Sequence, residues 1–130
     1  MEDNVPMARI MIIDDSLVAR MSLKACIPKD AGHEIKEGND GSVAIDLYPT
    51  FQPDVTFMDL TMPGVDGMAA LAEIRRLDPT ARVIILTADI QTRTIERVME
   101  LGAFGLLKKP PVKEAVQTEL TKALAAEKQG

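Results

Sequence analysis

Short apolar runs alternate with longer segments of helical periodicity along the chain. The runs lie at residues 8–13, 33–37, 55–59, 82–86 and 104–108. Most are mainly aliphatic, and the run at 33–37 alternates only weakly. Apolar runs of this length are typical of strands that are buried on both faces of a sheet. The pattern therefore predicts five strands.

Each predicted strand is followed by a segment whose apolar residues recur at helical spacing. These segments lie at residues 17–26, 42–48, 67–77, 90–101 and 112–125. Pro49 is expected to end the second helix, because proline lacks the backbone N–H that a helix interior needs. Asp15 or Ser16 is a suitable N-cap for the first helix.

Several of the predicted helices have an apolar stripe. In the first helix the stripe consists of Leu17, Val18, Met21 and Ala25. In the fourth helix it consists of Ile95, Val98 and Met99. Such a stripe typically faces the core, and the three residues of the fourth helix are expected to pack inward.

Strands and helices that alternate in this way predict an α/β fold, with a parallel sheet covered by helices on both faces. Right-handed crossovers bring the carboxyl end of every strand to one edge of the sheet. In such sheets ligands bind outside that edge, where the strand order reverses. We expect one domain over residues 8–126, a polar N-terminal tail at 1–7 and a short tail at 127–130.

Four predicted strands end in side chains with chemical capability. Asp14 and Asp15 follow the first strand, and Asp59 ends the third. The fourth strand stops at Thr87, and Lys109 follows the fifth. Each residue alone could be a helix cap, a turn former or a surface group. Their common position at the carboxyl ends of parallel strands favours a functional site instead.

Three carboxylates in one small site repel one another. This repulsion either raises the pKa of at least one of the carboxyl groups or favours binding of a cation. Oxygen ligands without His or Cys favour a hard cation, and Mg²⁺ is usually held by one or two carboxylates with waters and phosphate oxygens. Asp59 is then a candidate nucleophile, since carboxylates form aspartyl-phosphate intermediates. The chain lacks the glycine-rich loop GxxxxGK[ST], so a nucleotide held in such a loop is not the expected phosphoryl donor.

Charge and composition narrow the expected partners. The formal net charge is −5, which argues against a nucleic-acid surface and against a polybasic membrane anchor. The single cysteine, Cys26, cannot form an intramolecular disulfide and is expected to be buried, which suits a cytoplasmic location. The N-terminal residues lack the apolar segment of a signal peptide, and no apolar run approaches the ~20 residues that span a bilayer.

The segments at residues 12–15, 58–67, 85–88 and 102–110, taken in this order, resemble the receiver domain of two-component response regulators, the CheY-like family. The resemblance extends from about Arg9 to Leu124. The spacing from Asp14 to Arg20 and the motif that starts at Asp59 are most similar to stand-alone chemotaxis-type regulators. The family implies a flavodoxin-like sheet of five parallel strands in the order 2-1-3-4-5, flanked by five helices.

The resemblance also implies roles for individual residues. Asp59 would be the phosphoacceptor. Asp14, Asp15 and Asp59, with the backbone carbonyl of Thr61, would form the Mg²⁺ site. Lys109 would be the cationic partner of the phosphoryl group.

The same resemblance implies a readout of the phosphorylated state. Thr87 would move its hydroxyl toward the phosphoryl group, and the family commonly has Tyr or Phe, an aromatic ring that swings inward, where Leu106 stands. Phe104, two residues earlier, could face the same side of the strand. Family usage also suggests a cis peptide bond before Pro110. Pro111 replaces the Phe that commonly follows, and it stiffens the entry to the last helix.

Together these observations predict a phosphorylation-dependent signalling switch with only weak self-phosphorylation and self-dephosphorylation, not an enzyme. A partner histidine kinase or phosphotransfer protein would supply the phosphoryl group, and a downstream protein would bind the face formed by residues 90–125. We expect a monomer or a weak phosphorylation-dependent dimer, with no nucleic-acid or membrane partner.

Several pathways are compatible with such a switch: chemotaxis, a phosphorelay shuttle, or a receiver module of a longer regulator. An aspartyl-nucleophile phosphatase is the alternative from another class. It is disfavoured because Thr61 stands where the second Asp of such enzymes would be, and because the chain has no room for a cap domain.

Overall fold

The structure is a computed structural model that describes residues 7–29, 31–62 and 64–125. Within these residues the elements are β1 (Arg9–Ile13), α1 (Leu17–Cys26), β2 (Glu34–Gly38), α2 (Gly41–Phe51), β3 (Val55–Asp59), α3 (Gly67–Leu77), β4 (Val83–Thr87), α4 (Thr92–Glu100), β5 (Gly105–Lys108) and α5 (Lys113–Ala125). Neighbouring strands are parallel, in the order β2-β1-β3-β4-β5. The predicted flavodoxin-like fold is confirmed. Apart from Met7, the two expected tails lie outside the described residues.

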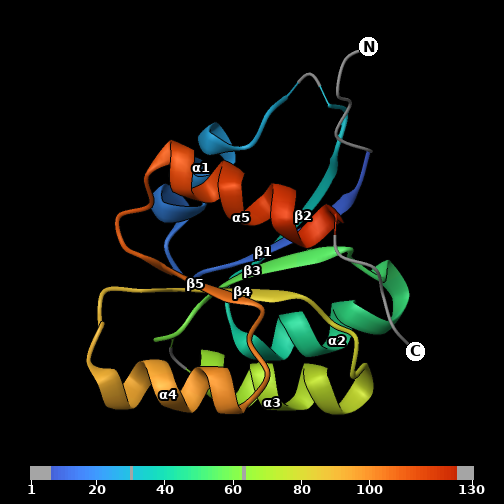
Figure 1. The fold of residues 1–130 in the computed structure, drawn as a ribbon. Coiled ribbons are helices and arrows are strands. Elements are labelled where there is room, and N and C mark those ends of the chain that lie inside the picture. The colour runs from blue at the N-terminus through green and yellow to red at the C-terminus, as the bar shows by residue number, and fades with distance from the viewer. Residues whose placement is uncertain (1–6, 30, 63, 126–130) are drawn as a thin grey trace.

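Helices cover both faces of the sheet (Figure 1). α1 and α5 lie on one face, and α2, α3 and α4 lie on the other. Side chains along each central strand alternate between the two layers: Ile10 and Ile12 pack with α1 and α5, whereas Met11 and Ile13 pack with the other helices. The central strands are therefore apolar on both faces, which is why they form continuous apolar runs in the sequence.

Most expected element bounds lie within two residues of the observed ones, and α2 is the exception. It continues through Pro49 to Phe51 and does not end at the proline. Because Pro49 lies in the last turn, its missing N–H removes a single helical hydrogen bond, and the buried ring of Phe51 holds that turn against the core. Gln52 ends the helix in the left-handed conformation, and its N–H donates to the carbonyl of Tyr48.

The apolar stripe of α1 does not face the core. The exposed fractions of Leu17, Val18 and Met21 are 58%, 71% and 56%. The helix buries Leu23 instead, and Cys26, which was expected to be buried, is only half buried. Helical spacing shows that residues share a face, but it does not show which face meets the sheet. The stripe therefore remains available on the surface.

Few side chains attach α4 to the rest of the fold. Val98 is the buried residue of this helix. Ile95 is partly buried, and Met99, which was expected to face inward, is exposed. An element with so few buried apolar groups can shift at low cost in free energy. None of the helices in the described part of the chain is long and apolar enough to cross a membrane.

Candidate functional site

The carboxyl ends of β1 and β3 bring three carboxylates together. The two strands are adjacent, with Ile13 beside Met58 in the register. Asp14 and Asp15 follow β1 and Asp59 ends β3, so all three leave the same edge of the sheet. One oxygen of each carboxylate lies within 4.8 Å of the others. Asp14 and Asp59 are buried, whereas Asp15 is exposed.

Lys109 reaches this cluster from the loop after β5. Its ammonium nitrogen lies 2.8 Å from Oδ2 of Asp14 and 3.0 Å from Oδ1 of Asp59. Burial alone would lower the pKa of Lys109, but the hydrogen bonds to the two carboxylates outweigh burial and raise the pKa. The lysine therefore stays charged between the two buried aspartates. The peptide bond from Lys109 to Pro110 is cis, which confirms the expectation.

The two buried carboxylates differ in how they are held. Asp14 accepts hydrogen bonds at Oδ1 from the N–H of Ser16 (2.9 Å) and at Oδ2 from Lys109. Its own N–H donates to the carbonyl of Gly38 at 3.1 Å. Burial raises the pKa of Asp59, the hydrogen bond from Lys109 offsets part of this effect, and the charge of Asp14 adds to it. A further cation beside Asp59 would relieve this unfavourable charge.

The ligand chemistry of the cluster fits a hard divalent cation. Asp14, Asp15 and Asp59 offer only oxygen atoms, and oxygen-only sites favour Mg²⁺ or Ca²⁺ over zinc. The site contains three carboxylates and one ammonium, so a bound cation would offset its excess negative charge. Thr61 follows Asp59 by two residues and is exposed. The ligand role of its carbonyl stays a prediction.

Thr87 lies beside the cluster and is coupled to α4. It is buried at the end of β4, the strand next to β3. Its hydroxyl oxygen accepts a hydrogen bond from the N–H of Asp89 (2.9 Å). The carboxylate of Asp89 accepts from the N–H of Gln91 (3.0 Å) and from the hydroxyl of Thr94 (2.8 Å). Asp89 thus joins the Thr87 hydroxyl to the first turn of α4.

Phe104 and Leu106 face opposite sides of the sheet, although their two-residue spacing would allow the same side. Leu106 packs against the α2, α3 and α4 layer, whereas Phe104 packs against the α1 and α5 layer. β5 begins at Gly105, so Phe104 precedes the strand and does not follow its alternation. Phe104 therefore does not supply an aromatic ring on the side of Leu106.

Sequence reasoning did not identify two contacts that shape the site. The guanidinium of Arg20 donates to the carbonyl of Asp14 at 2.6 Å. A Cβ atom at Gly67 would collide with the backbone of Asp59 and Leu60, so only glycine lets α3 start this close to the end of β3. The Gly67 N–H also donates to the carbonyl of Leu60 at 2.9 Å. The glycine and arginine were visible in the motifs, but their partners depend on the fold.

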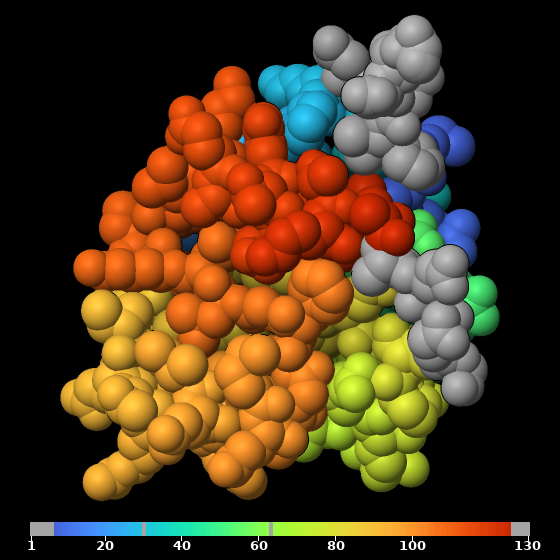
Figure 2. Space-filling view, viewed as in Figure 1, coloured from blue at the N-terminus to red at the C-terminus, as the bar shows by residue number. Residues whose placement is uncertain are grey.

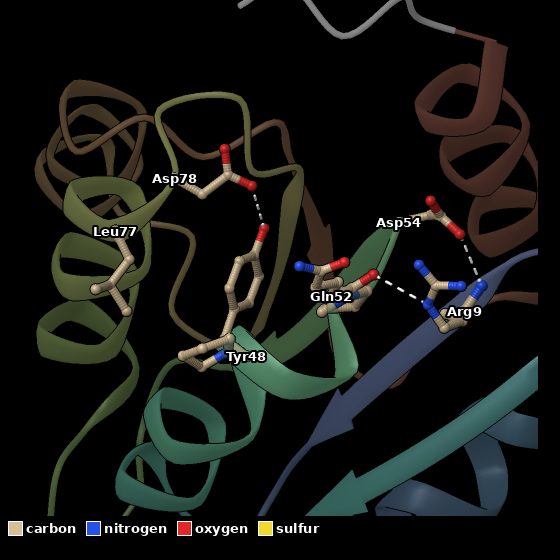
Figure 3. A pocket seen from close by; sticks show the side chains of 8 residues that line it. Arg9, Tyr48, Gln52, Asp54, Leu77 and Asp78 are labelled. Carbon is tan, nitrogen blue, oxygen red and sulfur yellow. Dashed lines mark hydrogen bonds between the residues drawn. The ribbon is translucent and has the colours of Figure 1, made fainter.

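A separate hollow of about 430 Å³ lies at the opposite edge of the sheet (Figure 3). Its lining includes Arg9 and Asp54, which hydrogen-bond to each other through the Arg9 N–H at 2.8 Å. The hydroxyl of Tyr48 donates to Asp78 at 2.8 Å, which ties α2 to the end of α3. The Arg9–Asp54 bond joins the amino ends of β1 and β3, whereas the Tyr48–Asp78 bond joins two helices.

The fold and the cluster define a flavodoxin-like α/β protein with an acidic, oxygen-only site at the carboxyl edge of its sheet. Residues 10–122 match the family described as the response regulator receiver domain. The chain belongs to this family, and it works as a phosphorylation-dependent signalling switch. Nothing in the comparisons favours a phosphatase.

Similar proteins come from several bacteria. The chain is 34% identical to chemotaxis protein CheY of Bacillus subtilis over 116 residues, which is 89% of this chain and 97% of that protein. It is 37% identical to chemotaxis protein CheY of Thermotoga maritima over 103 residues, or 78% and 85% of the two chains. It also resembles a solved structure of the CheX–CheY–BeF3–Mg²⁺ complex from Borrelia burgdorferi, with a TM-score of 0.83, 26% identity and coverage of 91% and 90%.

Proposed function

We propose that Asp59 is the phosphoacceptor of this switch. The observation that carries the proposal is the Asp59 carboxylate, which lies at the strand edge beside a charged lysine and two further carboxylates. A phosphohistidine on a partner kinase or phosphotransfer protein would donate the group. An oxygen of Asp59 would form the new bond to phosphorus as the bond from phosphorus to the histidine nitrogen breaks.

The three carboxylates would hold a Mg²⁺ ion, with the backbone carbonyl of Thr61 as a further ligand. When bound, the ion would neutralise charge on the transferring phosphoryl oxygens, which is the main requirement of phosphoryl transfer. Lys109 would exchange its hydrogen bond with Asp59 for one with the phosphoryl group. Its present contacts with both buried aspartates put its ammonium within reach of that position.

Thr87 would pass the change on to α4. To donate its hydroxyl proton to the phosphoryl group, Thr87 has to turn toward Asp59, and this motion strains its hydrogen bond with the Asp89 N–H. α4 is weakly buried, so it is the element that such a local charge change can move. The output surface would be the face on which α4, β5 and α5 lie side by side (Figure 2), which a downstream protein would bind.

The exposed apolar stripe of α1 would serve as the docking surface for the protein that carries the phosphohistidine. Leu17 lies two residues after Asp15, so the stripe begins next to the cluster and continues along the helix through Val18 and Met21. Exposed apolar groups in such a row are typical of protein interaction sites. The donor would thus dock on α1 and present its histidine to Asp59.

We propose chemotaxis as the pathway, because the chain aligns with nearly the whole length of the Bacillus CheY protein. A phosphorelay shuttle and a receiver module of a longer regulator are the alternatives within the same class. The switch would operate in the cytoplasm as a monomer or a weak phosphorylation-dependent dimer. Self-phosphorylation from small donors and self-dephosphorylation would be slow.

Phosphorylation by acetyl phosphate tests the acceptor directly. Intact-mass spectrometry should detect one added phosphoryl group on the wild-type protein with Mg²⁺ present, and none on Asp59→Asn. Asp46→Asn is the matched control, because Asp46 is exposed on α2 and outside the cluster. An Asp59→Asn protein that gains the group as readily as wild type would overturn the assignment.

A further inference from the structure

We propose that Arg20 is a positioning residue, which fixes the peptide unit that joins Asp14 to Asp15 and thereby orients the Asp15 carboxylate toward the cation site. The inference rests on the proposed function, because it concerns the same cluster. It adds a residue on α1 that touches neither phosphoryl group nor metal and acts through the backbone of the acidic pair.

The side chain of Arg20 bridges two elements. It leaves α1 and is mostly shielded from solvent, with 16% of its side chain exposed. Nη1 donates to the backbone carbonyl of Asp14 at 2.6 Å, and Nε donates to Oε1 of Glu37 at 2.8 Å. Two nitrogens of one planar guanidinium are therefore fixed at once, which limits the orientations available to the group.

Glu37 is itself held in place, so it can anchor Arg20. Its other oxygen accepts a hydrogen bond from Lys24 at 2.6 Å. The hydrogen bond from Lys24 and, more weakly, that from Arg20 lower the pKa of Glu37, although burial opposes the shift. Glu37 therefore stays charged at neutral pH. The chain of contacts runs from β2 through α1 to the residue after β1.

The Asp14 carbonyl and the Asp15 N–H belong to one planar peptide unit. A charge-assisted hydrogen bond to that carbonyl fixes the plane and, with it, the N–Cα bond of Asp15, which limits the directions in which the Asp15 side chain can leave the backbone. Asp14 is also held by Ser16, Gly38 and Lys109. Within the described residues the exposed Asp15 carboxylate makes no hydrogen bond or ion pair. Its orientation therefore depends on the backbone that Arg20 holds.

The competing interpretation is that Arg20 contributes only its charge. A positive charge near a cation site repels the cation, so loss of that charge alone should tighten Mg²⁺ binding. Loss of positioning should weaken it, because residues that orient metal ligands contribute about 10–100-fold to affinity. The two interpretations predict opposite signs for the same substitution.

Calorimetric titration with Mg²⁺ separates them. We expect Arg20→Met to bind Mg²⁺ at least about tenfold more weakly than wild type. Arg20→Lys keeps the charge but cannot span both acceptors, so it should also bind more weakly. Glu37→Gln leaves Arg20 in place without its charged anchor and should cause a smaller loss. Arg76→Met is the matched control, since Arg76 is exposed and pairs with Glu73 within α3.

Each outcome has a distinct meaning. Arg20→Met that binds Mg²⁺ as tightly as wild type, or more tightly, overturns the inference and leaves the proposed function intact. Wild-type protein that binds no Mg²⁺ overturns the proposed metal site and this inference together. Circular dichroism checks that each variant is folded. If Arg20→Met does not fold, Arg20→Lys decides, because it keeps the charge, and unchanged affinity in that variant also overturns the inference.

Discussion

At the scale of single residues, the site combines groups whose charges are unbalanced. Among the described residues, Lys109 is the one ammonium in contact with the cluster. It contacts Asp14 and Asp59, and the carboxylate of Asp15 lies close by. Buried like charges cost folding free energy unless a cation neutralises them. Binding of a cation at this cluster, as proposed above, would therefore stabilise the folded protein.

Asp59→Asn should accordingly stabilise the metal-free protein by about 1 kcal/mol, in the range of substitutions that trade function for stability. The sign follows from the raised pKa of Asp59: its charge is disfavoured in the folded state at neutral pH, and the neutral amide removes that cost. Urea unfolding with a chelator present measures the change. Asp46→Asn is the control and should change stability by less than about 0.5 kcal/mol. A destabilised Asp59→Asn would mean that the ion pair with Lys109 outweighs the repulsion.

His33 predicts a pH dependence that is independent of the site. Its Nδ1 accepts a hydrogen bond from the N–H of Ala8 (3.0 Å), and its Nε2 is buried with no partner in the described part of the chain. Burial lowers the pKa of His33. A surface hollow of about 410 Å³ is lined by His33 together with Lys24 and Lys29. Protonation would put a hydrogen on Nδ1 and break the bond to Ala8.

The folded state therefore binds this proton less readily than the unfolded chain, whose pKa is about 6.5. Stability should be full above that pH and should fall as the pH drops through it toward the lower folded pKa. Urea unfolding at a series of pH values from about 7.5 to 5.5 measures the slope. His33→Asn, which cannot titrate, should show a flatter profile. Identical slopes in the two proteins would assign the titration to other groups.

At the scale of elements, α4 buries only Val98 among its residues, and its first turn is held by a neighbouring loop. Gln91, at the N-cap position, makes no side-chain capping bond. Asp89 takes this role by accepting from the Gln91 N–H and the Thr94 hydroxyl, and these bonds lower the pKa of Asp89. The residue that caps α4 is thus the one whose N–H binds Thr87.

Thr94→Val should loosen α4 without disturbing the sheet. Loss of a capping contact typically costs about 0.5–1 kcal/mol, and most of the effect should be local because the helix buries little. Hydrogen exchange should quicken for amides of residues 92–100 and stay unchanged in β1 and β3. Thr92→Val is the control, because Thr92 is exposed in the same turn. Uniformly faster exchange throughout the protein would instead indicate global destabilisation.

At the scale of the whole molecule, the sequence was sufficient for the fold but not for every helix face. Central strands buried on both faces are mostly apolar, so their number and parallel arrangement followed from the pattern. The face of a helix that meets the sheet depends on tertiary packing, which is why the sequence did not show that Leu17 of α1 is exposed, and why the predicted inward orientation of Met99 was wrong. The prediction that Pro49 ends the second helix was wrong for the same reason, because burial of Phe51 holds the last turn of α2 against the core.

The residues of the candidate site could be chosen from the sequence because parallel topology puts strand ends at one edge. The contacts between these residues could not be predicted from the sequence. Nothing in the order of residues indicates that Arg20 reaches the carbonyl of Asp14, or that Asp89 connects Thr87 to α4. Such contacts involve backbone atoms, whose positions only the folded chain defines.

Mg²⁺ should stabilise the whole molecule if the cluster binds it in the folded state only. The free energy of unfolding should rise by about 2.7 kcal/mol when Mg²⁺ is at a hundred times its dissociation constant. Thermal or urea unfolding with and without Mg²⁺, at matched ionic strength, measures the increase. Asp15→Asn removes the exposed ligand and should lose most of it. An equal increase in both proteins would mean that the ion acts elsewhere.

The hydrogen bond between Tyr48 and Asp78 has a practical consequence for optical measurements. Tyr48 is the single tyrosine of a chain that has no tryptophan, and it lines the hollow at the edge of the sheet opposite the carboxylates (Figure 3). Its fluorescence should therefore follow separation of α2 from α3 during unfolding and should not respond to ligands at Asp59. A tryptophan introduced at the exposed Ala88, next to Thr87, would add a second emission for the site. One sample would then report stability and occupancy at two separate wavelengths.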